Sequence, residues 1–169
     1  DTFNLGTKRI SNLCDYLKEI SLPWTMMGRL DISPDWLYDK MVDCGCVGMR
    51  FGVETFNIDV LKNIEKGIER RDFRKTLEYI CLTYPEVMIH ITMMSDMPGQ
   101  TAEDTEIDMK IIKEMGFSID NILRSYQLSK CAPFPGTKLY EQMKTRLDEA
   151  TLKTYTLYDG GQDTIMKAS

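Results

Sequence analysis

Apolar residues recur along the chain at two spacings, one typical of helices and the other of strands. Ile10, Leu13, Leu17 and Ile20 recur at the helical spacing and Pro23 follows them, which predicts a helix that stops there. The same reading predicts further helices over residues 33–45, 57–67, 73–84 and 101–116 and around 139–143, and strands over residues 24–30, 49–53, 87–94 and 122–128.

Polar residues mark where several of these helices begin. Ser33 can cap the helix that follows Pro34, and Asn57 can cap a short helix that stops at Gly67. Thr101 can cap the helix in whose first turn Asp104 lies, where a carboxylate suits the helix dipole.

Strands that alternate with helices, without short hairpin signals, predict parallel βαβ units with right-handed crossovers. A complete eight-unit barrel needs about 250 residues, whereas this chain has 169 residues and about four predicted strands. We therefore expect an α/β fold that is part of a (β/α) barrel, with parallel strands and outer helices. Residues 1–150 would form this unit, and the poorly patterned residues 151–169 a peripheral tail.

Three of the predicted strands have one apolar face and one mixed, polar face. A parallel sheet covered by helices on both faces has strands that are apolar throughout, so the polar face must line a wetter space, such as a ligand-filled barrel. Four charged members of this face, Arg29, Asp31, Glu54 and Asp96, stand at the carboxyl ends of the strands, where barrels place their active sites. The polar-face residues are Thr25, Met27, Arg29, Asp31, Arg50, Gly52, Glu54, His90, Thr92, Met94 and Asp96.

Ion pairing offers another explanation for these charges. Arg50 could pair with Glu54 and Arg29 with Asp31, because burying such charges costs several kcal/mol unless they are paired. Pairing and ligand binding do not exclude one another.

The remaining composition narrows the class of protein. The net charge is −5 and no basic cluster occurs, so neither nucleic acid nor an anionic membrane is an expected partner. No signal peptide and no apolar run of about 18 residues is visible. The odd set of five cysteines, with Cys44 and Cys46 as the only close pair, fits no metal-site spacing and predicts reduced thiols in a cytoplasmic protein.

Four stretches, in order, resemble the motifs of one enzyme family. DTFN (Asp1–Asn4) resembles the end of a "DDTFN" segment, and CGCVGMRFGVET (Cys44–Thr55) is similar to "aGc…fGiES". MSDMPGQT (Met94–Thr101) resembles "iGlPGET", and APFPGTKLY (Ala132–Tyr140) resembles "PfPGTxlY". The family is that of radical S-adenosylmethionine enzymes linked to cobalamin-binding domains, which includes magnesium-protoporphyrin IX monomethyl ester oxidative cyclase-like proteins and methyltransferases.

The resemblance implies a radical S-adenosylmethionine partial barrel that holds S-adenosylmethionine at its carboxyl end. Glu54 would bind the ribose or the amino group of this cofactor, because an ionised carboxylate accepts from hydroxyl and ammonium donors. Arg29 would meet the methionine carboxylate, and the turn of Asp96, Pro98 and Gly99 would lie against the adenine. A small-molecule substrate, a 4Fe–4S cluster and cobalamin would complete the parent iron–sulfur oxidoreductase.

The sequence departs from this family in two places. The cluster motif CxxxCxxC is absent, so we expect a fragment without the cluster loop and the first two strands, inactive by itself. Asp96 stands where the family usually has glycine, which lets backbone and adenine approach closely.

A missing neighbouring strand would expose an edge around Met27, and exposed edges favour pairing, so we expect self-association there. Two other functions stay open. One is a non-catalytic α/β module that binds a small ligand or nucleotide. The other is an aldolase-like lyase, which needs a lysine on an interior strand face, and none is found there.

Overall fold

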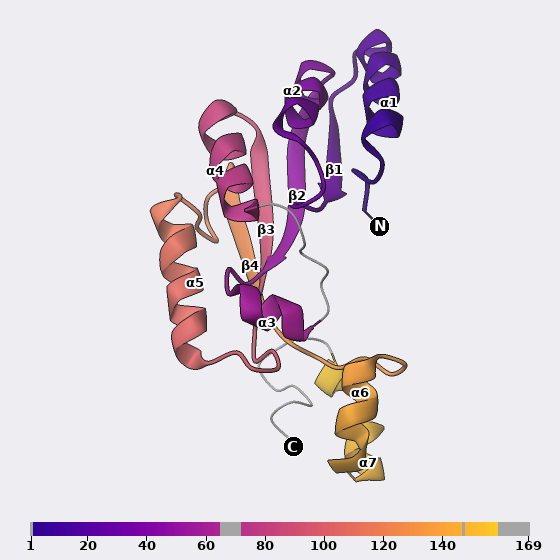
Figure 1. The fold of residues 1–169 in the computed structure, drawn as a ribbon, viewed down its shortest axis with the longest axis vertical. Coiled ribbons are helices and arrows are strands. Elements are labelled where there is room, and N and C mark those ends of the chain that lie inside the picture. Colours follow the sequence, from indigo (N-terminus) through magenta and orange to yellow (C-terminus); the bar gives the residue numbers. More distant parts are fainter. Residues whose placement is uncertain (1, 65–71, 147, 159–169) are drawn as a thin grey trace.

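One parallel sheet organises the protein, and the strands lie in it in the order in which they follow along the chain, β1-β2-β3-β4. The computed structural model describes residues 2–64, 72–146 and 148–158 (Figure 1). The strands are β1 (Trp24–Gly28), β2 (Cys46–Glu54), β3 (Met88–Ser95) and β4 (Arg124–Lys130). The helices are α1 (Thr7–Ile20), α2 (Asp35–Asp43), α3 (Ile58–Asn63), α4 (Phe73–Thr83), α5 (Ala102–Glu114), α6 (Lys138–Met143) and α7 (Glu149–Leu152), with short 3-10 turns at Lys144–Arg146 and Tyr155–Tyr158.

Helices α2, α4 and α5 cover one face of this sheet. Parallel strands in consecutive order, joined by right-handed crossovers, bring every crossover helix to the same side. Leu37 of α2, Leu77 of α4 and Ile112 of α5 accordingly share one buried cluster with Phe51 and Ile91, and Figure 1 shows α2, α4 and α5 ranged along the sheet. The predicted parallel α/β architecture with outer helices is confirmed.

Helix capping follows the sequence at two of three predicted positions. The Thr101 hydroxyl accepts from the Asp104 backbone N–H, and the Asp104 carboxylate accepts from the Thr101 N–H, which forms a capping box on α5. Asn57 caps α3 as predicted. The prediction for Ser33 was wrong: Pro34 occupies the N-cap of α2, and buried Ser33 instead accepts from the Asn4 side chain. The predicted stop at Gly67 lies outside the described residues.

Strand β4 begins at Arg124, later than the predicted start at Ile122, and this first residue is a buried arginine. Ile122 is 80% exposed and precedes the strand. The Arg124 guanidinium, only 8% exposed, donates to the carbonyls of Val87, Leu123, Cys81 and Tyr84 at 2.6, 2.7, 3.0 and 3.0 Å. Two of these acceptors, Cys81 and Tyr84, belong to the carboxyl end of α4, where the helix dipole favours a cation. Through these hydrogen bonds, Arg124 connects the edge strand β4 to the carboxyl end of α4.

The outer edge of β1 is partly occupied by the start of the chain. The Phe3 N–H donates to the Met27 carbonyl at 2.8 Å, and the Asn4 side chain bonds both backbone groups of Arg29. Self-association through this edge stays a prediction, and these bonds leave the Trp24–Met26 part of β1 as the stretch where a second chain could pair.

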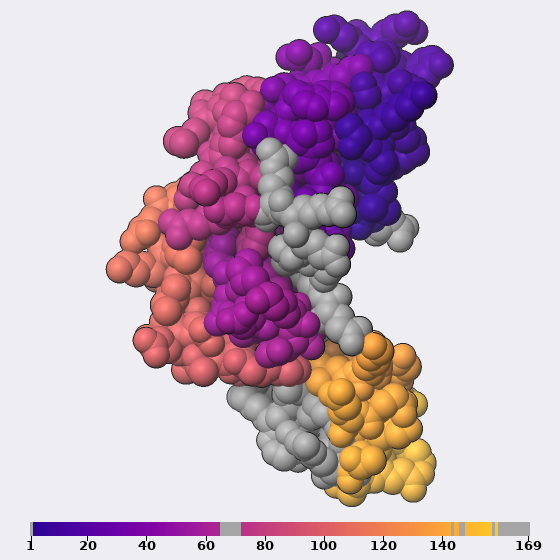
Figure 2. Space-filling model, viewed as in Figure 1, coloured from indigo at the N-terminus to yellow at the C-terminus, as the bar shows by residue number. Residues whose placement is uncertain are grey.

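The predicted peripheral tail begins near α7. Its described part packs on the segment around α6: the buried Tyr158 ring lies 6.4 Å from the rings of Phe134 and of Tyr140. Figure 2 shows α6 and α7 projecting beyond the body that the sheet and its helices form. The domain boundary at residue 150 stays a prediction, and Gly160 and Gly161 lie outside the described residues.

Replacing Arg124 tests whether its hydrogen bonds to backbone carbonyls stabilise the fold. We expect Arg124→Met to lower the free energy of unfolding by about 2 kcal/mol or more, because one buried and three partly buried carbonyls lose a charged donor. Arg74→Met on the surface of α4, where Arg74 pairs with Glu78, should change stability by less than about 1 kcal/mol. Urea denaturation of both variants measures the difference, and equal stabilities would contradict the assignment.

Candidate ligand-binding site

The open face of the sheet holds a cavity of about 310 Å³ at the carboxyl ends of β1, β2 and β3. By register, Met27, Arg50 and His90 are neighbours across the sheet, and Gly52 and Thr92 are neighbours one step further along. The alternation predicted from the sequence therefore places these side chains on one face. The cavity is lined by Thr2, Met27, Gly28, Arg29, Arg50, Gly52, Glu54 and Thr92.

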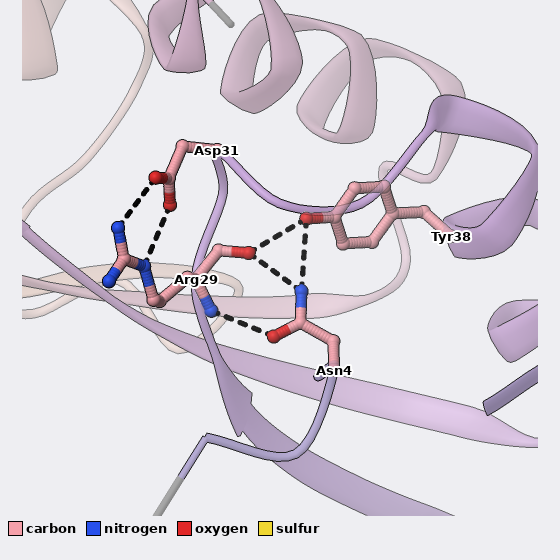
Figure 3. A network of polar contacts seen from close by, with 4 residues as sticks. All are labelled: Asn4, Arg29, Asp31 and Tyr38. Atoms are coloured by element: carbon pink, nitrogen blue, oxygen red, sulfur yellow. Dashed lines mark hydrogen bonds and ion pairs between the residues drawn. The ribbon is translucent and has the colours of Figure 1, made fainter. Parts of the chain in front are cut away.

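Arg29, which follows β1, lies in this cavity but is already paired. Its guanidinium donates to both carboxylate oxygens of Asp31, at 2.9 and 2.6 Å, and this pairing raises the pKa of Arg29 (Figure 3). The predicted Arg29–Asp31 pair is confirmed. A bidentate carboxylate satisfies much of the donor fork of an arginine, so the charge of Arg29 is largely neutralised before any ligand binds.

Asn4 fixes the backbone from which Arg29 projects. The Asn4 amide oxygen accepts from the Arg29 N–H at 2.9 Å, and its nitrogen donates to the Arg29 carbonyl at 2.7 Å, as a paired strand would (Figure 3). The Tyr38 hydroxyl from α2 donates to the same carbonyl at 3.0 Å. Gly28 is required here, since a Cβ on it would lie 2.5 Å from the Asn4 amide oxygen.

Glu54 ends β2 in an unusual backbone conformation. Its φ of 68° lies in the left-handed region, and the register between β2 and β3 shifts between Gly52 and Glu54. The following loop is held by α5: buried Asp108 accepts from the Phe56 N–H at 2.8 Å, and Asp104 accepts from Asn57 at 2.8 Å. A non-glycine residue costs about 1–2 kcal/mol in this region, and such strain is typical of functional positions.

Asp96 has the same type of backbone, with a φ of 59°. Aspartate is one of the few side chains that visit this region readily, so it can stand where the family resemblance expects glycine. The Asp96 side chain is exposed and lies 3.8 Å from Lys130, and it does not line the cavity that holds Arg29 and Glu54. In the register of the sheet, Lys130 lies opposite Ser95. The side chain that faces the open side of the sheet at this end of β3 is that of the preceding residue, Met94.

Pro98 lines a second, more apolar cavity of about 550 Å³ between the ends of β3 and β4 and α6. Cys131 lies in its wall, and burial, then Asp96 and Glu54, raise the pKa of its thiol. The structure therefore brings Arg29 and Glu54 together, places Pro98 in the neighbouring cavity and leaves Asp96 and Gly99 outside both linings. Gly99, with a φ of 79°, turns the chain against Asn63.

Arg50 and Asn4 were not proposed as ligand-binding residues from the sequence, although Arg50 was placed on the polar face. Arg50 lines the cavity, but its alternation with Glu54 suggested an ion pair between them. Among the described residues, Arg50 has no carboxylate partner, and its one hydrogen bond goes to the neutral Gln127 side chain at 3.4 Å. Asn4 appeared only as part of a resemblance motif, because nothing local shows that its partners lie beyond Gly28.

The sequence matches no protein-family model. It is 26% identical over 145 residues, 83% of the chain, to an uncharacterized methyltransferase of Pyrococcus horikoshii, of which it covers 29%. It is also 25% and 26% identical over 119 residues, 68% of the chain, to the tRNA uridine(34) acetyltransferases of Methanocaldococcus infernus and Methanocaldococcus jannaschii, of which it covers 21% each. The chain thus spans less than a third of the curated proteins it resembles.

Solved structures define the class of fold. The radical S-adenosylmethionine methyltransferase TsrM of Kitasatospora setae, solved with cobalamin and a 4Fe–4S cluster, superimposes with a TM-score of 0.69 at 17% identity over 86% of this chain and 29% of its own. The radical S-adenosylmethionine enzyme HemN of Escherichia coli gives 0.60 at 17% identity over 86% of this chain and 32% of its own. The archaeal Methanocaldococcus infernus Elp3 gives 0.54 at 19% identity over 83% of this chain and 37% of its own. The fold is that of the radical S-adenosylmethionine partial barrel.

Two substitutions at one position measure the backbone strain at Glu54. We expect Glu54→Gly to be about 1 kcal/mol more stable than Glu54→Ala, because glycine adopts the left-handed region without steric cost and this outweighs its greater freedom in the unfolded chain. Urea denaturation provides the comparison. An alanine variant at least as stable as the glycine variant would show that the position is unstrained.

Proposed function

We propose that the chain is part of a radical S-adenosylmethionine enzyme and supplies part of the pocket for S-adenosylmethionine and substrate. The observation that carries this proposal is a polar cavity at the carboxyl ends of the strands of a radical S-adenosylmethionine-type barrel. Barrel enzymes bind their ligands at that end, and TsrM has been solved with an S-adenosylmethionine analogue and tryptophan.

The cavity residues suit a nucleoside that carries an amino acid. Glu54 offers acceptors to ribose hydroxyls or an ammonium group, and cations are present to meet a carboxylate. The apolar second cavity beside Pro98 suits a flat base such as adenine. We propose Glu54, Arg29, Asp96, Pro98 and Gly99 as the residues around the cofactor, with Arg29 and Asp96 at its margin, since both already face an opposite charge.

An iron–sulfur cluster does not fit this chain. None of its five cysteines has the CxxxCxxC spacing, and the described residues contain no group of three histidine, cysteine, aspartate or glutamate side chains that could hold a metal ion. We therefore assign no step of the radical reaction to these residues, and we place the cluster in a longer parent protein. Cobalamin is supported by the likeness to TsrM alone.

Methyl transfer is the reaction type that the relatives favour over cyclisation. One relative is named a methyltransferase and the fold also matches TsrM, a methyltransferase. HemN, an oxidase, and the acetyltransferases show that the same fold serves other reactions, so the fold alone does not decide the reaction type.

In the described residues no helix combines the length and apolar character that a membrane crossing requires. We propose a cytoplasmic enzyme with a small-molecule substrate.

Binding of S-adenosylmethionine tests the pocket directly. We expect the protein to bind S-adenosylmethionine in isothermal titration calorimetry, and Glu54→Gln to weaken binding about tenfold by removing a charged acceptor. Glu86→Gln is the matched control, since Glu86 is exposed beside the amino end of β3 and should leave affinity unchanged. Equal affinity of wild type and Glu54→Gln would remove Glu54 from the site.

The radical reaction requires the parent protein. We expect the full-length parent, reconstituted anaerobically, to contain about four irons and four sulfides per cluster and to release 5′-deoxyadenosine or a methylated product from S-adenosylmethionine. A parent that binds S-adenosylmethionine but never forms a cluster would favour the non-catalytic binding module instead.

A further inference from the structure

Arg50 is a cation that the described structure leaves without a counter-charge. It stands on the open face of β2, between Met27 of β1 and His90 of β3. Its only hydrogen bond to a described residue is the 3.4 Å contact with the Gln127 amide oxygen, which is neutral. Arg29, the other arginine of the cavity, is neutralised by Asp31. The two arginines of one cavity therefore differ in what they can still bind.

The surroundings of Arg50 leave space for a ligand on the sheet. Gly52, the next residue of β2 on this face, has no side chain, and its neighbour Thr92 presents a hydroxyl that bonds no other described residue. Both residues line the cavity together with Arg50. A guanidinium fork beside a hydroxyl donor matches the two oxygens of a carboxylate.

The charge of the cavity decides between anions. With Arg29 paired to Asp31, Arg50 is the arginine of the lining that has no carboxylate partner among the described residues. A singly charged carboxylate would match the single guanidinium of Arg50, whereas a doubly charged phosphate would leave an unbalanced negative charge in the cavity.

We propose that Arg50 and Thr92 form a carboxylate-binding subsite on the floor of the cavity. The ligand is a small molecule that carries one carboxylate, and a hydrogen-bond donor on the same molecule can reach toward Glu54. Two sources have this chemistry: the methionine part of S-adenosylmethionine and the substrate. The first source rests on the proposed function, whereas the subsite itself does not.

His90 provides a built-in probe, because it is the only histidine of the sequence and lies beside Arg50 in the sheet. Its Nδ1 bonds the Ser125 hydroxyl at 2.9 Å, and its Nε2 is enclosed without a partner among the described residues. Burial and then Arg50 lower the pKa of His90. A bound carboxylate would screen Arg50 and raise this pKa.

The test follows the His90 ring resonance by NMR while sodium acetate is added, with sodium chloride as the ionic-strength reference. We expect acetate to shift the resonance in a saturable way and to raise the pKa of His90. Arg50→Gln should weaken acetate binding about tenfold and Thr92→Val by a smaller factor, since a charged fork donates more than a hydroxyl. Arg50→Gln should also raise the pKa of His90 without acetate.

Two controls keep the result specific. Arg74→Gln removes the same charge from α4 and should leave acetate binding unchanged, and Arg50→Lys should restore part of it. If acetate acts no differently from chloride, or acts equally on wild type and Arg50→Gln, Arg50 is a solvated surface charge and the proposal is wrong.

A second arm identifies the source of the carboxylate. If Arg50→Gln weakens S-adenosylmethionine about tenfold but leaves its decarboxylated analogue unaffected, the cofactor supplies the carboxylate. If acetate binding depends on Arg50 while S-adenosylmethionine binding does not, the substrate supplies it. If S-adenosylmethionine fails to bind wild type although acetate does, the proposed function fails and the subsite stands.

Discussion

The structure depends on the difference between the two faces of one parallel sheet. Crossover helices can cover only one face when the strands follow one another in order, so one face must be apolar and the other must meet water or a ligand. The covered face holds Met49, Phe51, Ile89 and Ile91 at 2% exposure or less. The open face consequently gathers polar groups in a concave region, and this separation creates a site before any single residue is specified.

The site depends on backbone conformations that regular strands do not adopt. Glu54 and Asp96 both leave their strands with positive φ, which turns the chain sharply where the cavity opens. Capping and loop contacts from α5 stabilise the first of these turns, since Asp104 and Asp108 bind the loop that follows Glu54. Burial raises the pKa of Asp108 even though its carboxylate accepts a hydrogen bond from the Phe56 N–H, because burial disfavours the charged form.

Local sequence patterns predict the parts of this fold that depend on interactions between residues close in sequence. The alternation of buried and exposed side chains in β2 and β3 can be predicted from a few consecutive residues, and so can the helix cap at Thr101. The structure confirms both. The role of Arg124 was not predicted, because an arginine is usually a surface residue. Its burial depends on the carbonyls of Cys81 and Tyr84, which are distant in sequence. Asn4 was missed for the same reason, since it acts on backbone 25 residues away.

The comparison of Arg29 with Arg50 shows why charge alone does not locate a ligand. Arg29 follows the strand end where the family resemblance expects a carboxylate partner, but Asp31 lies two residues away and already engages the guanidinium. A ligand carboxylate would have to displace or share that partner, at the cost of a charge-assisted bond on each side. Arg50 needs no such exchange, because its neighbour in the sheet is a histidine and its hydrogen-bond partner is an amide. The arginine proposed to bind a new anion is therefore the one whose charge no described carboxylate balances.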